Sequence, residues 1–378
     1  MSYGQHISRR QFLKAAGTAV AATGLAAGAG GCSPAKVLSS TVEVKDSIGR
    51  IVQIPSAHKI DHVYFTSALA QIFCFTVAPD LIAGTSMHFD GKQLALLPEG
   101  TGDLPFLGTL SEGGTIDVEA LDYMGTQVIF SISGVDLTDV NIDDAIRLQE
   151  RSGIPVVLID GSFDQIGESY RFLGECLGRE ERANLLADYC EEILERVTSA
   201  LQRVPQDERV TYYFAEGEQG LQTEPNASQH SLAFTTAGGI NVAADEEYVV
   251  GSGAIVDVSI DQIRAWNPQF IIAWDKEYRD GAAKLIRESE AWRNIEAVRN
   301  GRVFEMPSLP FPFCDRPPGM NRFLGVQWLA NLFYPRYYDV DMVDVVREFY
   351  ARCYWRDVTA DQAREILGVS YDYARSAK

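Results

Sequence analysis

The sequence lacks the short motifs that mark most hydrolases, nucleotide-binding enzymes and metalloenzymes. It contains no GxSxG, no GxxxxGK[ST], no HExxH and no GxGxxG after a predicted strand. The chain has only five histidines, and no CxxC pair is present. Enzymatic activity is therefore disfavoured. A dedicated site for a free metal ion is also disfavoured, because a zinc site needs three or four protein ligands.

Positive charge is scarce. The chain has 33 Lys and Arg against 52 Asp and Glu, a net charge of −19. A nucleic-acid partner is excluded, because binding to phosphates needs clustered Lys and Arg. At 46% hydrophobic and 22% charged residues the chain has the composition of an ordinary globular protein, long enough for one large or two medium domains.

Cysteine is also sparse, with six residues in 378. If Cys32 is modified, as argued below, the remaining five form neither an even-numbered disulfide framework nor a zinc site. We expect most of them to be small buried side chains. Pairing of Cys176 with Cys190 across a helical hairpin stays open.

The first 31 residues have the three parts of an export signal. Arg9, Arg10 and Lys14 are the only charged residues before an apolar, glycine-rich run that ends at Cys32. The run is too short and too rich in glycine for a good membrane span. The alternative is an N-terminal helix with two chance arginines.

Two short stretches of this segment resemble known signals. Residues 8–14, SRRQFLK, resemble a twin-arginine signal, and residues 29–32, AGGC, resemble a lipobox with Ala29 where Leu is commonest. These resemblances imply a signal peptide at 1–31 and a lipidated Cys32, followed by a tether up to residue 41. We therefore expect an extracytoplasmic protein, lipid-anchored to the cell membrane on its periplasmic or outer face.

Short apolar runs alternate with helical patterns in two separate parts of the chain, which is typical of βα units with a mostly parallel sheet. The first series of runs is 62–65, 81–85, 127–131 and 155–160. The second series is 209–214, 269–275 and 302–306. Helices are expected at 143–152, 261–265, 281–288 and 319–332. The pattern predicts an α/β fold with two Rossmann-like lobes, at 42–163 and 205–378, and a ligand cleft between them.

Residues 164–204 carry no strand signal. Apolar residues recur there with a 3.6-residue period, interrupted at Gly178. We expect a long helical backbone that joins the lobes. The alternative is a helical hairpin packed inside a single domain.

Together, these features resemble the substrate-binding proteins of ABC importers, in the helical-backbone class that serves iron–siderophores, haem, cobalamin and some metal oxyanions. Four segments carry the resemblance in the correct order: 44–55, 177–183, 237–243 and 260–273. It implies that the protein is a monomer, has no cofactor and captures a metal chelate. A ferric siderophore is the first choice of ligand. Haem, cobalamin and molybdate or tungstate are the alternatives. The implied partners are an ABC permease and its ATPase. A lipid-anchored sensor module or an exported enzyme is the alternative from another class.

The resemblance also implies one permease-docking carboxylate on each lobe. The matching positions are Glu119 and Asp261, where Asp replaces the usual Glu. Exposed ion pairs of this kind steer docking and fix orientation. The alternative is a solvated acid near a helix N-terminus, favoured by the helix dipole.

Ligand contacts in a two-lobed α/β protein lie at the carboxyl ends of the strands. Those ends supply His88 and Ser133 in the first lobe, and Glu216 and Trp274 in the second. His88 or His230 could cap a haem iron or a cobalt from one side.

A proline-rich loop at 307–318 also ends in the predicted cleft. Its Phe311 and Phe313 would offer apolar faces to a chelate, and Arg316 would grip a carboxylate or an oxyanion. The alternative is a rigid linker with both rings packed inward and Arg316 paired to Asp315.

Overall fold

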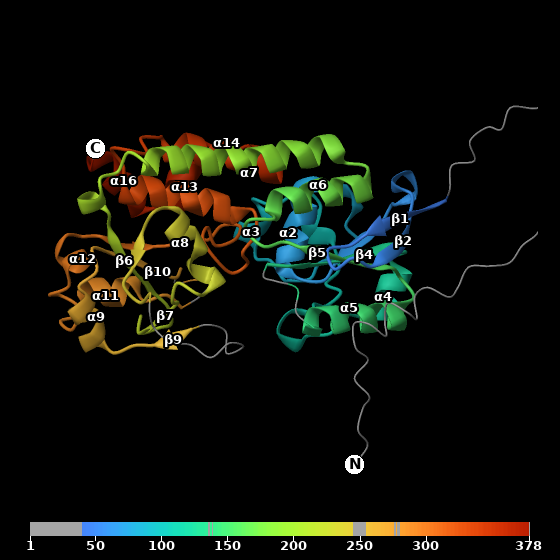
Figure 1. The fold of residues 1–378 in the computed structure, drawn as a ribbon, viewed down its shortest axis with the longest axis horizontal. Helices are drawn as coiled ribbons and strands as arrows, with labels where there is room; N and C mark the ends of the chain where they lie inside the picture. The colour runs from blue at the N-terminus through green and yellow to red at the C-terminus, as the bar shows by residue number, and fades with distance from the viewer. Residues whose placement is uncertain are drawn as a thin grey trace, which may run out of the picture.

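The computed structural model describes residues 40–377 except 135, 136, 138, 245–254, 276, 278 and 279. The predicted signal segment, the lipidation site Cys32 and most of the tether lie outside the described residues. Two α/β lobes lie side by side beneath a layer of helices (Figure 1). The main sheet of each lobe is parallel, as the continuous apolar runs predict. The predicted α/β fold is therefore confirmed.

An antiparallel hairpin of β1 (Thr41–Lys45) and β2 (Ile51–Pro55) opens the described chain. At its turn, Arg50 pairs with Asp46 at 2.7 Å, and both side chains are buried. Arg50 Nη2 also donates to the carbonyl oxygen of Val156 at 2.8 Å. This ion pair therefore fastens the hairpin to the sheet of the first lobe.

The first lobe has a parallel sheet in the order β3-β4-β5. Its strands are β3 (Val63–Phe65), β4 (Val128–Ser133) and β5 (Val156–Asp160). The helices of this lobe are α2 (Ala68–Val77), α3 (Gly91–Leu94), α4 (Val118–Tyr123) and α5 (Asp139–Ser152).

The predicted strand at 81–85 is reduced to isolated bridges. Ile82 bridges to Val63, and Thr85 bridges to Phe106. The backbone amide of Ala83 donates to Val63 at 2.9 Å, whereas that of Thr85 donates to Pro105 at 2.7 Å. The segment forms no continuous strand because its hydrogen bonds change partner after two residues.

The second lobe has a parallel sheet in the order β11-β10-β6-β8, and β7 and β9 form a small antiparallel pair. The strands are β6 (Thr211–Ala215), β7 (Gln222–Thr223), β8 (Ile240–Asn241), β9 (Val256–Asp257), β10 (Phe270–Ala273) and β11 (Val303–Glu305). The helices are α8 (Leu232–Thr236), α9 (Ile260–Trp266), α11 (Ala283–Glu288) and α12 (Glu296–Arg299). The three predicted runs became β6, β10 and β11.

Helices α6 (Ile166–Leu177) and α7 (Glu180–Leu201) follow the first lobe and form the predicted helical link. Gly178 separates them with a φ of +63°, a left-handed conformation that favours glycine. Helix α7 has 22 residues, about 33 Å at 1.5 Å per residue, and runs along one side of both lobes (Figure 1). The helical layer is completed by α13 (Asn321–Phe333), α14 (Met342–Tyr354), α15 (Ala360–Leu367) and α16 (Val369–Ser376).

Helix α13 is buried on all sides and lies in the hydrophobic core shared by the linking helices and both lobes. Six 3-10 turns complete the described elements: η1 (Ala57–Lys59), η2 (Pro79–Leu81), η3 (Thr101–Asp103), η4 (Ser111–Gly113), η5 (Gln206–Glu208) and η6 (Gln229–Ser231). None of the helices in this part of the chain is long and apolar enough to span a membrane.

The five cysteines in the described range are free and buried, including Cys176 and Cys190. The pairing that the sequence left open is therefore absent from this structure. The Cys190 thiol instead lies 3.7 Å from the sulfur of Met320, at the start of α13.

Candidate functional site

The end of β4 in the first lobe lies close to the second lobe, and the narrow space between Gly134, Pro318 and Gln229 is called the gap below. Gly134 directly follows β4, and a Cβ atom at this position would lie 2.9 Å from Cγ of Pro318 in the second lobe. The lobes also meet through an ion pair between Lys92 and Glu277 at 2.7 Å. A side chain larger than hydrogen at position 134 would therefore push the lobes apart.

A cluster of buried charges lies next to this gap in the second lobe, because His230 follows Gln229 and Arg316 lies two residues before Pro318. Arg316 Nη2 donates to Glu224 Oε1 at 2.5 Å, and Arg316 Nε lies 3.1 Å from Asp315 Oδ2. Both carboxylate side chains are fully buried, whereas the side chain of Arg316 is 19% exposed. Of these three side chains, Arg316 is therefore the one that reaches solvent.

Asp315 also contacts two further basic side chains. It accepts a hydrogen bond from Nδ1 of His230, and it lies 3.7 Å from Nη2 of Arg322. Arg322 is buried and donates through Nε to the carbonyl oxygen of Cys314 at 3.2 Å. Burial lowers the pKa of the Arg322 guanidinium to about 10. Asp315 thereby fixes the orientation of three basic groups.

The pKa of Glu224 is raised chiefly by burial of its carboxyl group. A hydrogen bond from Ser228 and the positive charges of His230 and Arg316 oppose this shift. The carboxylate form of Glu224 therefore depends on the basic groups around it.

Two predicted ligand contacts of the second lobe, Trp274 and Arg316, come together in the structure. Trp274 follows β10 and is mostly buried, and the Arg316 guanidinium lies 5.8 Å from the centre of its ring. Glu216 follows β6 with a fully buried side chain. Its backbone pairs with that of Gln222, the first residue of β7.

Of the predicted contacts of the first lobe, Ser133 lies at a strand end, whereas His88 follows a segment that forms no continuous strand. Ser133 is the last residue of β4, and it is half-buried next to Gly134. His88 is exposed, and its ring packs on Phe106 with centroids 4.2 Å apart.

The two phenylalanines of the proline-rich loop face inward, contrary to the expectation that they present their rings to a ligand. Phe311 is 1% exposed and Phe313 is fully buried. Phe311 packs against Phe89 and Tyr354, with ring centroids 6.2 Å away in each case. The loop folds over the core between α14 and the first lobe, and burial of both rings stabilises that path. The structure agrees here with the alternative expectation, including the contact between Arg316 and Asp315.

Sequence reasoning missed Glu224 and Gln229. Both lie in the irregular segment between β7 and α8, which carries no motif and no periodic pattern. The amide oxygen of Gln229 lies 3.5 Å from the position that a Cβ of Gly134 would take. No pattern in the sequence indicates that this segment folds against the end of β4.

The two predicted docking acids differ in their surroundings. Glu119 is exposed in the first turn of α4, after the N-cap Asp117. Asp261 is exposed in the first turn of α9 but pairs with Arg264 at 2.8 Å. Helices α4 and α9 both lie on the side of the lobes away from α7 (Figure 1).

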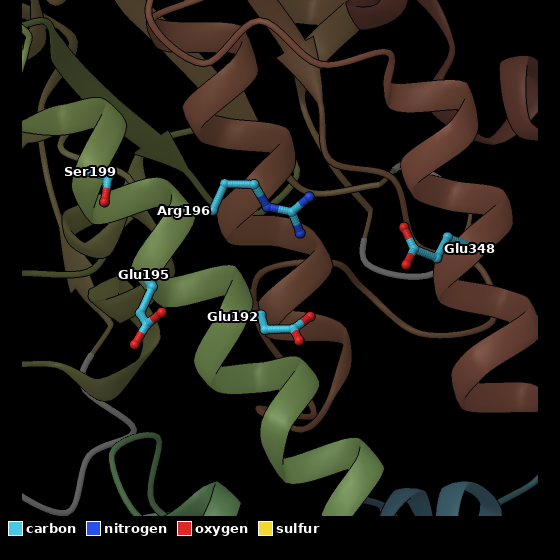
Figure 2. Close-up of a pocket in the computed structure, with 5 residues that line it drawn as sticks. All are labelled: Glu192, Glu195, Arg196, Ser199 and Glu348. Atoms are coloured by element: carbon cyan, nitrogen blue, oxygen red, sulfur yellow. The ribbon is translucent and has the colours of Figure 1, made fainter.

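A separate pocket of about 450 Å³ lies on the helical layer. It is lined by Glu192, Glu195, Arg196 and Ser199 of α7 and by Glu348 of α14 (Figure 2). Glu348 already pairs with Arg352 at 2.8 Å. Within the described ranges, no group of three His, Cys, Asp or Glu side chains is arranged to hold a metal ion.

Comparison with known proteins agrees with this architecture. A model of the periplasmic binding protein family matches residues 109–310, which is more than half of the chain. A model of the twin-arginine translocation signal matches residues 6–26.

Two curated proteins match by sequence. The molybdate-binding protein MolA of Haemophilus influenzae is 26% identical over 272 residues, which cover 66% of this chain and 73% of MolA. The uncharacterized ABC transporter substrate-binding lipoprotein YvrC of Bacillus subtilis is 24% identical over 196 residues, which cover 51% of this chain and 58% of YvrC.

Solved structures match over most of the fold. An ABC transporter solute-binding protein from Sulfurospirillum deleyianum has a TM-score of 0.75 at 26% identity, and the match covers 86% of this chain and 98% of that one. MolA bound to molybdate has a TM-score of 0.66 at 22% identity, with 84% and 99% coverage. The chain belongs to the periplasmic binding protein family, and it is an extracytoplasmic solute-binding component of an ABC transporter, exported by the twin-arginine pathway.

Proposed function

We propose that this protein captures a small metal oxyanion, of the molybdate or tungstate class, and delivers it to its permease. The observation that carries the proposal is the asymmetric burial of the charge cluster. Glu224 and Asp315 are fully buried, whereas Arg316 remains 19% exposed at the gap. A ligand that enters the gap therefore meets a guanidinium whose orientation is fixed by two carboxylates, and such a group favours an anion.

The close approach of the two lobes disfavours a bulky ligand at this point. Gly134 and Pro318 approach so closely that one added carbon atom would clash. The rings of Phe311 and Phe313, which would have suited a bulky chelate, are buried. The similarity to MolA, a molybdate-binding protein, supports the same class of ligand.

A ferric siderophore, the first choice from the sequence, is the second candidate. The observation that favours it is the exposed ring pair of His88 and Phe106 on the first lobe. This pair would offer a flat surface to a chelate, and the imidazole would supply a ligand to the iron of haem or the cobalt of cobalamin.

A ligand panel tests the proposal. Molybdate, tungstate, sulfate, phosphate, ferric siderophores, haem and cobalamin are compared by thermal shift on the wild-type protein and on Arg316→Lys. At one hundred times the dissociation constant a ligand adds about 2.7 kcal/mol of stability, or about 4 °C for a chain of this size. We expect that shift with molybdate or tungstate, and a smaller one in Arg316→Lys, because lysine lacks the planar fork of N–H groups. The exposed Arg293 provides the matched control, Arg293→Lys. A shift with siderophores alone would favour the second candidate.

We also propose that Glu119 and Asp261 contact the permease. Glu119 is exposed, whereas Asp261 is already paired with Arg264, which in turn donates to Ala291 at 2.9 and 2.7 Å. Since a fixed internal partner weakens a second ion pair, we expect Glu119→Ala to lower uptake more than Asp261→Ala. Ligand affinity should be unchanged in both variants, and equal uptake by the Glu119 variant and the wild type would refute the assignment.

Attachment of the protein to the membrane is proposed to occur through a lipid on Cys32. The lipobox-like residues before Cys32 support the anchor, as does the similarity to a lipoprotein. Cys32→Ser should release the exported protein from the membrane fraction, and retention of this variant would contradict the proposal.

A further inference from the structure

Gln229 occupies an unusual position at the gap between the lobes. It begins the 3-10 turn η6 in the second lobe, and its amide oxygen faces Gly134 at the end of β4 in the first. This oxygen is buried and has no hydrogen-bond partner among the residues that the structure describes. A buried acceptor without a partner is costly, so its position needs an explanation.

The backbone around Gln229 is held in place on the second lobe. The next residue, His230, is hydrogen-bonded to Asp315, and Asp315 also contacts Arg316. The amide of Gln229 and the guanidinium of Arg316 therefore belong to one fixed assembly that borders the same gap. Because Gly134 has no side chain, Pro318 and Gln229 of the second lobe can approach the end of β4 closely.

We propose that the terminal amide of Gln229 contacts the ligand and selects it by its hydrogen-bonding character. The inference rests on the proposed function, because it concerns the same gap and the same class of ligand. A carboxamide presents an acceptor oxygen and a donor NH₂ group on one planar unit, and a rotation of 180° exchanges them. A fully deprotonated oxyanion offers only acceptors, so Gln229 donates its NH₂ group to it, beside the guanidinium of Arg316.

Two substitutions at this position separate the possible roles. Gln229→Leu keeps the approximate size of the side chain but removes both the donor and the acceptor. Gln229→Glu keeps the shape but leaves only acceptors and adds a negative charge, which repels an anion at contact. An oxyanion should therefore bind most tightly to the wild type, less tightly to the Leu variant and least tightly to the Glu variant.

The test is isothermal titration of the mature protein with sodium molybdate and sodium tungstate. We expect Gln229→Leu to weaken binding by at least about tenfold, and Gln229→Glu by a further factor of about ten. The exposed Gln165, at the start of α6 and outside the gap, provides the matched control, and Gln165→Leu should bind as the wild type does. Unfolding temperatures of all variants report whether each one folds.

Each outcome distinguishes the inference from the function on which it rests. If the wild type binds molybdate or tungstate and the folded Leu variant binds equally well, Gln229 makes no contact and the inference is wrong. If the Glu variant binds more tightly than the Leu variant, the ligand donates to Gln229 and the assigned direction of the hydrogen bond is wrong. If the wild type binds neither anion, the proposed function fails, and the assignment of a donor role fails with it.

Discussion

Replacement of Arg316 by alanine should show how much the buried charge cluster contributes to the free energy of unfolding. Arg316→Ala leaves the carboxylate of Glu224 buried without the guanidinium that lies 2.5 Å away. Asp315 keeps His230 and Arg322 as partners, so the largest effect falls on Glu224. Loss of one partner of a buried ion pair costs about 3–5 kcal/mol. With an unfolding entropy of about 0.7 kcal/mol/K for a chain of this length, the unfolding temperature should fall by about 4–7 °C at neutral pH.

The loss should depend on pH in a defined direction. Burial raises the pKa of Glu224 in the folded protein, and Arg316 opposes that shift. Without Arg316 the pKa of Glu224 in the folded protein rises further. The pH range in which Glu224 is protonated in the folded state but ionised in the unfolded state therefore becomes wider. Stability then falls as pH rises from about 4.5, the ordinary glutamate value, through the raised pKa. The difference from the wild type should therefore be smaller at pH 5 than at pH 8.

Calorimetric or denaturant unfolding at both pH values measures the effect, and Glu224→Gln provides the internal check. In the Arg316→Ala background, Glu224→Gln removes the unpaired charge and should restore part of the lost stability. A loss below about 1 kcal/mol, equal losses at pH 5 and pH 8, or no rescue by glutamine would refute this account of the cluster.

Three further predictions concern other parts of the molecule. Gly134→Val should separate the lobes and weaken ligand binding, as measured by titration. The control Gly91→Ala, whose added Cβ meets no atom within 4 Å, should bind the ligand as the wild type does. Equal ligand affinities of the Gly134 variant and the wild type would contradict the close approach of the lobes at Gly134. In a Cys32→Ser background, native protein should react negligibly with a thiol reagent, because the five described thiols are buried and burial raises the pKa of Cys176 to about 12. After denaturation without reductant five thiols should react, and a count of three would indicate a disulfide. Replacement of Arg9 and Arg10 by lysine should leave the precursor in the cytoplasm, and undiminished export would argue against the twin-arginine route.

The fold could be predicted from the sequence because its signals are local. Continuous apolar runs such as residues 127–131 indicate buried parallel strands, and the 3.6-residue period across 164–204 indicates helices. The segment at 81–85 looked equally strand-like. The hydrogen-bond partners of its backbone are Val63 and Pro105, which are distant in the sequence, so no local pattern predicts them.

The site could be predicted only in part. Arg316 and Trp274 could be proposed for the site from the sequence because they follow a strand or lie in a recognisable loop. Glu224 pairs with a residue 92 positions away, and His230 with one 85 positions away, so no spacing rule connects them. The direction of Phe311 and Phe313 was mistaken because a loop of prolines has no periodicity to show which face is buried.

The most direct test of the central claim is to locate the ligand in a crystal of the mature protein grown with sodium molybdate, by the anomalous scattering of molybdenum. The account predicts one molybdenum peak in the gap between the lobes, with its oxygens within hydrogen-bonding distance of Arg316. A peak elsewhere, or a gap without molybdenum at a saturating concentration, would contradict it.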